Sequence, residues 1–380
     1  MPQIFGSREL LEDVHQRELC IGCGACVDLC PYFKNYKGKT SQLFPCNLEQ
    51  GRCYAYCPKA EVDLNQLNRE IWHVDYDGSP LGPYRKVLAA RAGVQMETGT
   101  FQAGGTVSAL MTFALKHRLI EAAALTDREG LIPVPRLVTD WKKVAGCASS
   151  KFMASPTLSA LNRGVTEGFN RLGVVGTPCQ MTAAAQMRTT PLEKEAHRVP
   201  LSLCVGLFCN WAIDTRQLLE LLSRQLNISD VRGMDIPPPP AGIMVLETGN
   251  GSVEVSLSDI KPLIPHTCFV CLDMTSEFAD LSVGMYEGRT GWNTLLIRSE
   301  RGAEIVDQAR REKFIETETF PAENLNHLSK AAAQKKERSL RTLIRRELIN
   351  NQGDERAAIR IPPGVVDRIL SGSRDPDRKS

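Results

Sequence analysis

Closely spaced cysteines are the residues of this chain with the clearest chemistry. One run has x2, x2 and x3 spacings and ends on a proline; it consists of Cys20, Cys23, Cys26, Cys30 and Pro31. In such a run three thiolates wrap one cubane iron–sulfur cluster, and the fourth cysteine reaches toward a neighbouring cluster. Gly22 and Gly24 loosen the loop so that several sulfur atoms can point at one centre. Structural zinc usually takes paired C-x2-C units, so the run predicts a 4Fe-4S cluster.

A second cysteine motif follows with x6 and x3 spacings and comprises Cys46, Cys53 and Cys57. By analogy with two-cluster ferredoxins, Cys57 completes the first cluster, while Cys30, Cys46 and Cys53 hold a second one. Three thiolates leave one corner of that cluster without a cysteine. It is therefore either a 3Fe-4S centre, or its fourth ligand is a non-cysteine group or a distant cysteine. The alternative is one cluster with additional structural thiols.

Six more cysteines lie in the rest of the chain. Cys268-x2-Cys271 has the two-ligand spacing typical of metal sites. Cys179 and Cys209 each end an expected strand, at a place where loops converge. We expect these four residues to hold a further 4Fe-4S cluster, which makes two to three clusters in all. The remaining two, Cys147 and Cys204, either contribute a twelfth ligand or are buried as small apolar residues.

Length and composition restrict the classes of protein. The 380 residues allow two to three compact units, and the 42% apolar and 24% charged residues indicate a globular protein. A formal net charge of +2 does not favour nucleic acid as a partner. The N-terminus has no apolar core of a secretory signal, and no apolar run is long enough for a transmembrane segment. Thirteen cysteines without an export signal predict a cytoplasmic, reducing location.

The periodicity of the apolar residues predicts an α+β fold. Expected strands are 87–93, 172–179, 201–209, 279–284 and 293–299, with a hairpin at 243–248 and 252–257; expected helices are 107–125, 156–172, 213–226 and 302–312. We divide the chain into a small ferredoxin-like iron–sulfur module (1–75), a body in two parts (85–165 and 170–318) and a basic helical tail (320–380).

The tail has an amphipathic pattern. Its last 51 residues, 330–380, contain 13 Lys and Arg against 7 Asp and Glu, and Leu340, Leu343, Ile344 and Leu348 fall on one helical face. Because an isolated amphipathic helix is barely stable, we expect this stripe to dock onto a partner. Binding to anionic lipid is the weaker alternative.

Six ordered motifs in the body carry a family resemblance. They are AGGTVSAL (103–110), SSKFMASPTLSAL (149–161), GVVGTPCQ (173–180), GLFC (206–209), CFVCLDMTSEFADLSVG (268–284) and GRTGW (288–292). Residues 85–318 thereby resemble the coenzyme F-420 hydrogenase/dehydrogenase beta-subunit family. The resemblance implies one FAD, at least one 4Fe-4S cluster, and a flavin that exchanges electron pairs on one side and single electrons on the other.

The resemblance also suggests cofactor-binding residues. They are Gly104, Gly105, Thr106, Ser150, Lys151, Thr177, Pro178, Gln180 and Trp292. The glycine loop ahead of a long helix suits a diphosphate. Lys151 either meets the phosphate or flavin ring or is a solvated surface charge, and Trp292 either lines the flavin face or belongs to the core. We find no motif for a catalytic side chain among the six histidines.

The expected function is that of a flavin- and iron–sulfur-dependent oxidoreductase subunit. It would exchange hydride with a soluble carrier, reduced coenzyme F-420 or NAD(P)H, and relay single electrons through its clusters. The redox partner would be a formate dehydrogenase, a hydrogenase, a heterodisulfide-reductase-like complex or ferredoxin. Two alternatives remain open: an electron-relay adaptor without its own substrate, and a ferredoxin-dependent reductase of an organic substrate.

Overall fold

The computed structural model describes residues 3–96, 101–190, 192, 199–238, 240–350 and 355–371. At its centre lies an eight-stranded mixed sheet with the order β14-β4-β13-β12-β8-β7-β5-β6. The strands are β4 (Lys86–Ala92), β5 (Ala122–Glu129), β6 (Ile132–Val138), β7 (Leu172–Gly176), β8 (Leu201–Leu207), β12 (Leu281–Met285), β13 (Asn293–Ile297) and β14 (Ile315–Thr319). The four neighbours β12, β8, β7 and β5 are parallel, and the outer pairings are antiparallel.

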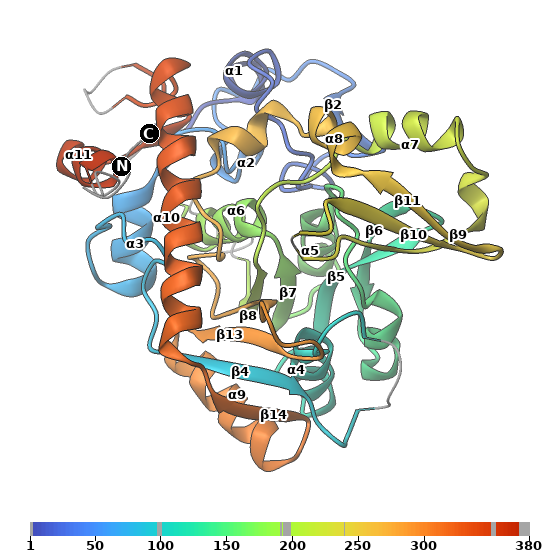
Figure 1. The fold of residues 1–380 in the computed structure, drawn as a ribbon. Coiled ribbons are helices and arrows are strands. Elements are labelled where there is room, and N and C mark those ends of the chain that lie inside the picture. The colour runs from blue at the N-terminus through green and yellow to red at the C-terminus, as the bar shows by residue number, and fades with distance from the viewer. Residues whose placement is uncertain are drawn as a thin grey trace.

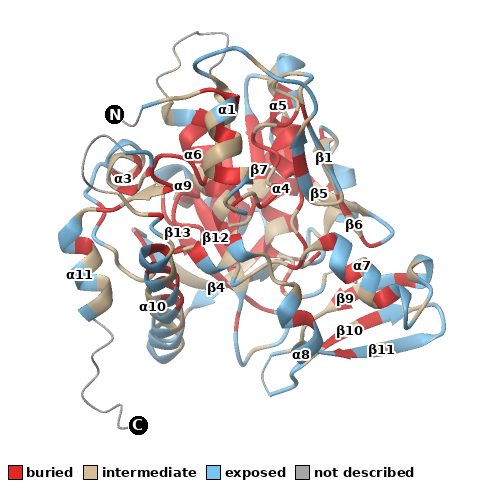
Figure 2. Cartoon of the chain, turned by 90° about the horizontal axis from the view of Figure 1, so that it is seen from above, coloured by how far each residue is buried: buried red, intermediate tan, exposed pale blue. Residues whose placement is uncertain are grey.

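Helices cover both faces of this sheet (Figure 1). On one face, α4 (Thr106–Lys116) and α9 (Glu300–Arg311) pack in one apolar core. On the other, α5 (Thr157–Thr166) and α6 (Pro178–Thr189) share a second core with the N-terminal segment. The buried residues of these layers are concentrated around the central strands (Figure 2). The parallel strands therefore end at one common edge, where ligands of open α/β sheets usually bind.

The N-terminal segment forms a small module on the α5/α6 face. Its elements are α1 (Ser7–Leu10), a π-helix (Leu11–His15), β1 (Phe33–Tyr36), β2 (Lys39–Gln42), α2 (Arg52–Ala55), β3 (Val62–Asp63) and α3 (Leu64–Trp72). Asn162 of α5 ties the module to the body, because its Nδ2 donates to the carbonyl oxygens of Val27 (2.7 Å) and Ala25 (3.1 Å). The cysteine-rich loop is thus held against the sheet domain and is not an independent lobe.

A three-stranded antiparallel sheet extends to the side with its own apolar core. It contains β9 (Val231–Asp235), β10 (Ile243–Thr248) and β11 (Gly251–Ser256), next to α7 (Thr215–Ser223) and α8 (Leu257–Ile260). Short 3-10 helices connect the rest: η2 (Trp141–Cys147), η4 (Ile228–Asp230), η5 (Lys261–Leu263) and η6 (His266–Val270).

The C-terminal segment packs on the molecule itself. It consists of α10 (Ala322–Arg345), β15 (Ile359–Arg360) and α11 (Pro363–Ser371), with β15 parallel to β3. Leu340, Leu343 and Leu348 are buried in the core shared with the N-terminal module, whereas Ile344 is 45% exposed. The expectation that this stripe docks onto a partner is therefore wrong, because the stripe already packs within the chain and Ile344 lies off it.

The α+β fold class is confirmed, and three expected elements are wrong in their extent. The helix expected over 156–172 ends at Thr166, and Leu172 begins β7. The expected helix over 107–125 ends at Lys116, and residues 122–125 begin β5. Ala122 and Ala124 pack in the core on one face of the sheet, and Ala123 and Leu125 pack in the core on the other face. Because both faces of this strand are buried, its sequence is continuously apolar and does not alternate. The expected strand over 172–179 ends at Gly176, and α6 was not foreseen. Within the described ranges, no helix has both the length and the apolar character to cross a membrane.

Candidate iron–sulfur and cofactor site

All thirteen cysteines are free thiols, and eleven of them form three groups. The first thiol group is Cys20, Cys23, Cys26 and Cys57. Burial raises the pKa of Cys23 and Cys26 well above its ordinary value, and the charges of Cys57 and Cys20 act in the same direction on both. Burial also raises the pKa of Cys57 to about 12. The structure thus brings Cys57 to the N-terminal run, as the ferredoxin analogy predicts.

The loop of the first thiol group depends on its glycines. Gly22 has a φ of +71° and Gly24 a φ of +88°, a region that favours glycine. A Cβ at Gly24 would overlap the backbone of Pro156, and a Cβ at Gly22 would overlap the carbonyl of Gly38. The glycines therefore allow close backbone approach as well as a tight turn.

The second thiol group contains Cys30, Cys46 and Cys53. Burial, together with the charges of Cys30 and Cys46, raises the pKa of Cys53 to about 11. The charge of Cys53 also raises the pKa of Cys26, so the first and second groups are neighbours. Three thiols gather here, and the alternatives for a fourth ligand stay open.

The third thiol group contains Cys179, Cys209, Cys268 and Cys271. Burial raises the pKa of Cys179, Cys209 and Cys268, and the charge of the neighbouring Cys271 acts in the same direction on all three. Cys179 lies in the first turn of α6, Cys209 follows β8, and the other two flank the end of η6. β7 and β8 are parallel neighbours, so the loops after them meet at one edge. The backbone N–H of Cys209 donates to Met274 (2.9 Å), which brings the loop after Cys271 to the same point.

In the described part of the chain, no three His, Cys, Asp or Glu side chains are arranged to hold a single metal ion. Zn–S bonds of about 2.3 Å would place tetrahedral thiolates about 3.8 Å apart. A cubane cluster is larger than one ion and spaces its ligands more widely. Groups of three or four thiols match the number of thiolate ligands that an iron–sulfur cluster takes.

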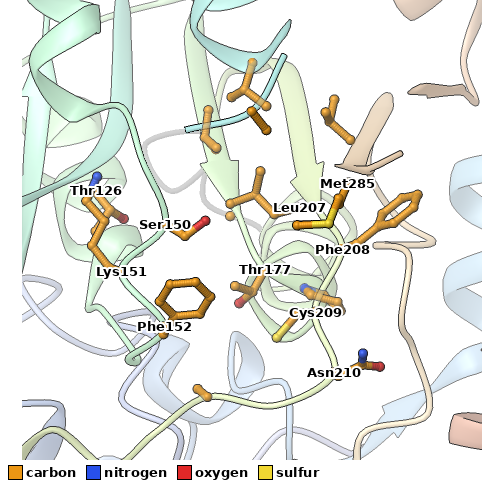
Figure 3. A pocket seen from close by; sticks show the side chains of 18 of the residues that line it. Thr126, Ser150, Lys151, Phe152, Thr177, Leu207, Phe208, Cys209, Asn210 and Met285 are labelled. Atoms are coloured by element: carbon orange, nitrogen blue, oxygen red, sulfur yellow. The ribbon is translucent and has the colours of Figure 1, made fainter. Parts of the chain in front are cut away.

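A cavity of about 620 Å³ opens at the carboxyl edge of the parallel strands. All four cysteines of the third thiol group line it, as do Gly105, Thr106, Ser150, Lys151, Thr177, Pro178 and Gln180. In Figure 3, Ser150, Lys151 and Phe152 lie on one side of this space, with Leu207, Phe208 and Met285 on the other and Thr177 and Cys209 between them. The size is that of an organic-ligand pocket. Gly104 and Trp292 are not among its lining residues.

The N-terminus of α4 is built for close approach. Gly105 precedes the helix with a φ of +72°, and a Cβ there would lie 2.6 Å from the ring of Phe101. A Cβ at Gly104 would lie 2.5 Å from Oδ1 of Asn293. That oxygen accepts hydrogen bonds from Oγ1 (2.9 Å) and N–H (3.3 Å) of Thr106. The absence of a side chain at Gly104 therefore allows Asn293 to pack against it. Asn293 was not expected from the sequence, because no motif marks it.

Lys151 is buried beside the cavity. Its Nζ donates to the carbonyl oxygens of Cys147 (2.7 Å), Ala148 (2.7 Å) and Ser149 (2.9 Å). Burial lowers the pKa of Lys151 to about 8. The interpretation as a solvated surface charge is therefore wrong. The neighbouring N–H of Ser150 donates to Oε1 of Gln102 (2.7 Å), which was not foreseen.

Thr177 and Gln180 orient the first turn of α6. Oε1 of Gln180 accepts from the N–H (2.9 Å) and Oγ1 (3.2 Å) of Thr177, and its Nε2 donates to the carbonyl of Ser155 (2.8 Å). This is a capping box with Pro178 at the first helical position. Its effect is to hold Cys179, whose Sγ lies 3.3 Å from Oγ1 of Thr177.

Trp292 lies in a separate small core with Ala89 and Tyr286. The guanidinium carbons of Arg289 and Arg91 lie 4.0 Å and 4.7 Å from the centre of its ring. Trp292 is therefore a core residue, the second of the two interpretations of the sequence, and its side chain does not reach the cavity.

Two buried lysines accompany the thiols and were not foreseen. Nζ of Lys335, from α10, donates to the carbonyl oxygens of Cys209 and Asp273 (both 2.7 Å). Burial opposes its charge, but Cys271 and Cys209 beside it hold its pKa above the ordinary value. Lys59 is also buried and lines the cavity that the third thiol group shares with Cys23. Only Lys59 had a signal in the sequence, because it follows Cys57 and Pro58.

A buried polar network supports the loop after Cys271. The carboxylate of Asp273 accepts the N–H groups of Thr275, Ser276 (both 2.8 Å) and Glu277 (2.7 Å). Glu277 forms a fully buried ion pair with Lys336 of α10 at 2.6 Å. α10 therefore anchors the third thiol group through two consecutive lysines, Lys335 and Lys336.

The two remaining cysteines lie outside the three groups. Cys204 is buried within β8, and its N–H donates to Oδ2 of Asp280 (2.8 Å). Cys147 lies on the cavity wall near Lys151. The structure therefore places neither of them as a twelfth thiol at a group.

Comparison with known proteins settles the family. Models of the coenzyme F-420 hydrogenase/dehydrogenase beta subunit match twice, the N-terminal part over residues 87–162 and the C-terminal part over 169–323. The chain belongs to this family. A 4Fe-4S binding domain matches residues 14–32, which contain the cysteine run of the first thiol group. The beta-subunit chain is thus an iron–sulfur protein of an oxidoreductase family that transfers electrons.

Relatives of this beta-subunit chain come from several enzymes. The beta subunit of coenzyme F-420 hydrogenase from Methanococcus voltae is 28% identical over 71% of this chain and 98% of its own length. One component of the reduced-F-420 dehydrogenase from Methanosarcina mazei is 28% identical over 82% of this chain and 88% of its own. A coenzyme F-420-dependent sulfite reductase from Methanocaldococcus jannaschii is 26% identical over 81% of this chain and 48% of that protein.

A solved structure shares the fold. The F-420-reducing NiFe hydrogenase complex from Methanosarcina barkeri contains a chain that superposes with a TM-score of 0.65 and is 26% identical. The match covers 70% of this beta-subunit chain and 93% of that chain. Subunits of this kind work in complexes, so a partner subunit is implied for this chain as well.

Proposed function

We propose that this chain exchanges hydride with a soluble carrier at a bound FAD and relays single electrons through iron–sulfur clusters to a partner protein. The observation that supports this most is the shared cavity. One side of it is the helix N-terminus and strand edge typical of a nucleotide site, and the other side is the third thiol group. A two-electron cofactor and a one-electron centre would then be in direct proximity.

The residues around the cavity fit FAD. Gly105 presents bare backbone at the N-terminus of α4, where N–H groups and the helix dipole favour a diphosphate. The ammonium of Lys151 adds a positive charge on the same wall. When bound, FAD accepts an electron pair as hydride and releases the electrons singly. The chain's part is to bind and orient the cofactor.

The three thiol groups form a series leading from the cavity. The charge of Cys179 raises the pKa of Cys23, so the third and first groups are neighbours. Cys53 acts on Cys26, which links the first group to the second. We assign 4Fe-4S clusters to the first and third groups, and a 3Fe-4S cluster or a 4Fe-4S cluster with a non-cysteine ligand to the second.

Coenzyme F-420 is the proposed carrier, because three of the relatives are named for it. NAD(P)H is the competing carrier. The proposed partners are a hydrogenase, a formate dehydrogenase, a heterodisulfide-reductase-like complex or ferredoxin, each of which takes electrons one at a time through its own clusters.

The test is anaerobic purification of the full chain, followed by quantification of iron, sulfide and flavin per chain. We expect one FAD and about eleven or twelve irons, since the three sites hold three or four irons each. Stopped-flow mixing with reduced coenzyme F-420 should bleach the flavin, and NADPH should do so more slowly. A protein with full clusters but no flavin would overturn the proposal in favour of a relay adaptor.

A further inference from the structure

The hairpin of β1 and β2 carries a group of apolar and basic side chains, all exposed except Lys37, which is half-buried. We call it the hairpin patch and define it as Tyr36, Leu43, Phe44, Lys34, Lys37 and Lys39. Tyr36, Leu43 and Phe44 are 71%, 54% and 60% exposed, which is unusual for side chains of this size. The loop that carries the last two continues to Cys46 of the second thiol group.

Strand geometry places these side chains together. Side chains alternate between the faces of a strand, so Lys34 and Tyr36 share the outer face while Phe33 is buried on the inner one. Tyr36 pairs with Lys39 across the hairpin, and Nζ of Lys37 lies 5.3 Å from the centre of the Tyr36 ring. The N–H of Leu43 donates to Tyr32 (2.7 Å), which extends the same surface.

The patch is attached firmly to the cluster loops. Nδ2 of Asn35 donates to Oγ1 of Thr40 (2.9 Å) and to the carbonyl of Gly22 (3.5 Å), within the loop of the first thiol group. Nε2 of Gln42 donates to the carbonyl of Phe44 (2.7 Å). A protein bound to the patch would therefore lie beside the loop of the first thiol group and beside Cys46 of the second, which follows Phe44 by two residues.

The charge of this surface selects the partner. Residues 31–52 contain Lys34, Lys37, Lys39 and Arg52 against the single acid Glu49. One further acid, Asp28, lies 3.9 Å from Nζ of Lys34. A basic face with an apolar centre attracts an acidic partner and repels a second copy of itself. Its small extent suits the transient, low-area contacts of redox carriers and not an obligate subunit interface.

We propose that the hairpin patch docks a small acidic iron–sulfur carrier protein, and that single electrons pass between this carrier and the cluster at the second thiol group. This inference rests on the proposed function for the clusters, and it does not require the flavin. In the transfer, one electron leaves the carrier's reduced cluster and enters the chain's oxidised cluster, or moves in reverse. No bond forms or breaks and no proton moves.

The experiment mixes the oxidised, cluster-replete full chain with a pre-reduced acidic two-cluster bacterial ferredoxin in a stopped-flow instrument. The charge variant is Lys34→Glu, Lys37→Glu, Lys39→Glu, and the apolar variant is Tyr36→Ser, Leu43→Ser, Phe44→Ser. The matched control is Arg310→Glu, Arg311→Glu, Lys313→Glu, which reverses three positive charges at exposed positions at the end of α9. This end of α9 lies at the opposite end of the molecule from β2 (Figure 1).

We expect the charge variant to slow the bimolecular rate by about tenfold or more at low salt, because steering contributes about 10–1000-fold. The wild-type rate should fall with added salt, and the rate of the charge variant should not. The apolar variant should be slowed about tenfold at all salt concentrations. The control should match the wild type. Reduction by methyl viologen, which needs no docking, should be equal in all four proteins.

Several results would overturn the inference. Patch variants that react as fast as the wild type with ferredoxin exclude docking there. A loss of rate that viologen reproduces means that the variants damage the clusters. In that case the single variants Lys37→Glu and Tyr36→Ser, at the hairpin turn, decide the question. If these variants keep their full iron content and their normal rate of reduction by viologen, an unchanged rate of reduction by ferredoxin refutes docking. A patch variant that dissociates a wild-type dimer in sedimentation assigns the surface to a second copy instead. A flavin-free protein leaves this test intact, because the electrons come from ferredoxin.

Discussion

The first and third thiol groups each contain four cysteines but are assembled in different ways. Cys20, Cys23, Cys26 and Cys57 lie within 38 residues of one another, in a small module with few long elements. The third group draws on residues from 179 to 271, placed by the ends of β7 and β8, by η6 and by the buried Lys335. The first group lies in one short stretch of chain, whereas the third is positioned by the ends of sheet strands. We therefore expect the first site to depend on its bound cluster for its structure, and the third to keep its arrangement without one.

The largest expected effect tests this difference directly. Cys26→Ser should remove about eight irons per chain, because the small module depends on its clusters and the adjacent second group would be lost with the first. Cys179→Ser should remove only about four irons, because the sheet preserves the other two groups. Iron analysis and electron paramagnetic resonance of anaerobically purified protein measure both. Equal iron losses in the two variants would contradict the comparison.

The second prediction concerns the anchor of the third group. Glu277→Ala should destabilise the protein by about 3–5 kcal/mol, because it leaves the ammonium of Lys336 buried without its partner. Replacing both residues, Glu277→Leu with Lys336→Met, should restore much of that loss. Urea unfolding of the holoprotein measures the free energies. The pair Arg341–Glu337 on the same helix, which is more exposed, provides the control, and its removal should cost less than about 1 kcal/mol. A small effect of Glu277→Ala would mean that α10 does not anchor this loop.

A smaller effect should separate the redox properties of the two groups. Lys335→Met removes a buried positive charge hydrogen-bonded to the carbonyl of Cys209. We expect the midpoint potential of the third cluster to fall by tens of millivolts, since the charge stabilises the added electron. The first cluster should shift much less. Potentiometric titration followed by electron paramagnetic resonance resolves the two signals, and equal shifts would argue against local action.

The smallest effect concerns the cavity wall opposite the third group. Burial lowers the pKa of Lys151 to about 8, below the ordinary value of 10.5, so the unfolded chain binds more protons between these values. The free energy of unfolding should therefore rise by about 1 kcal/mol from pH 8 to pH 9 relative to Lys151→Met. FAD retention should weaken over the same interval, as the positive charge is lost. Calorimetry and flavin release measure the two trends, and parallel pH profiles for both proteins would refute the assignment.

The sequence alone determined the local features. The spacing of the run from Cys20 to Cys30 predicted a 4Fe-4S cluster, and the model of a 4Fe-4S binding domain matches this run. The analogy with two-cluster ferredoxins added Cys57, which the structure places beside Cys23. Most strands and helices of the body followed from periodicity, and ordered motifs identified the family. The capping box at Thr177 and Gln180 lies within a motif that the resemblance had already marked.

Only the tertiary structure decided the rest. The apolar stripe of α10 packs inside the chain, and Lys335 and Lys336 are buried, although the sequence suggested a basic helical tail that docks onto a partner. Asn293 and Trp292 are adjacent in sequence, yet one supports the α4 N-terminus and the other lies in a separate core. Periodicity reports which face of an element is apolar. It does not report which distant element covers that face, because that depends on the strand order and on the packing of segments far apart in the chain.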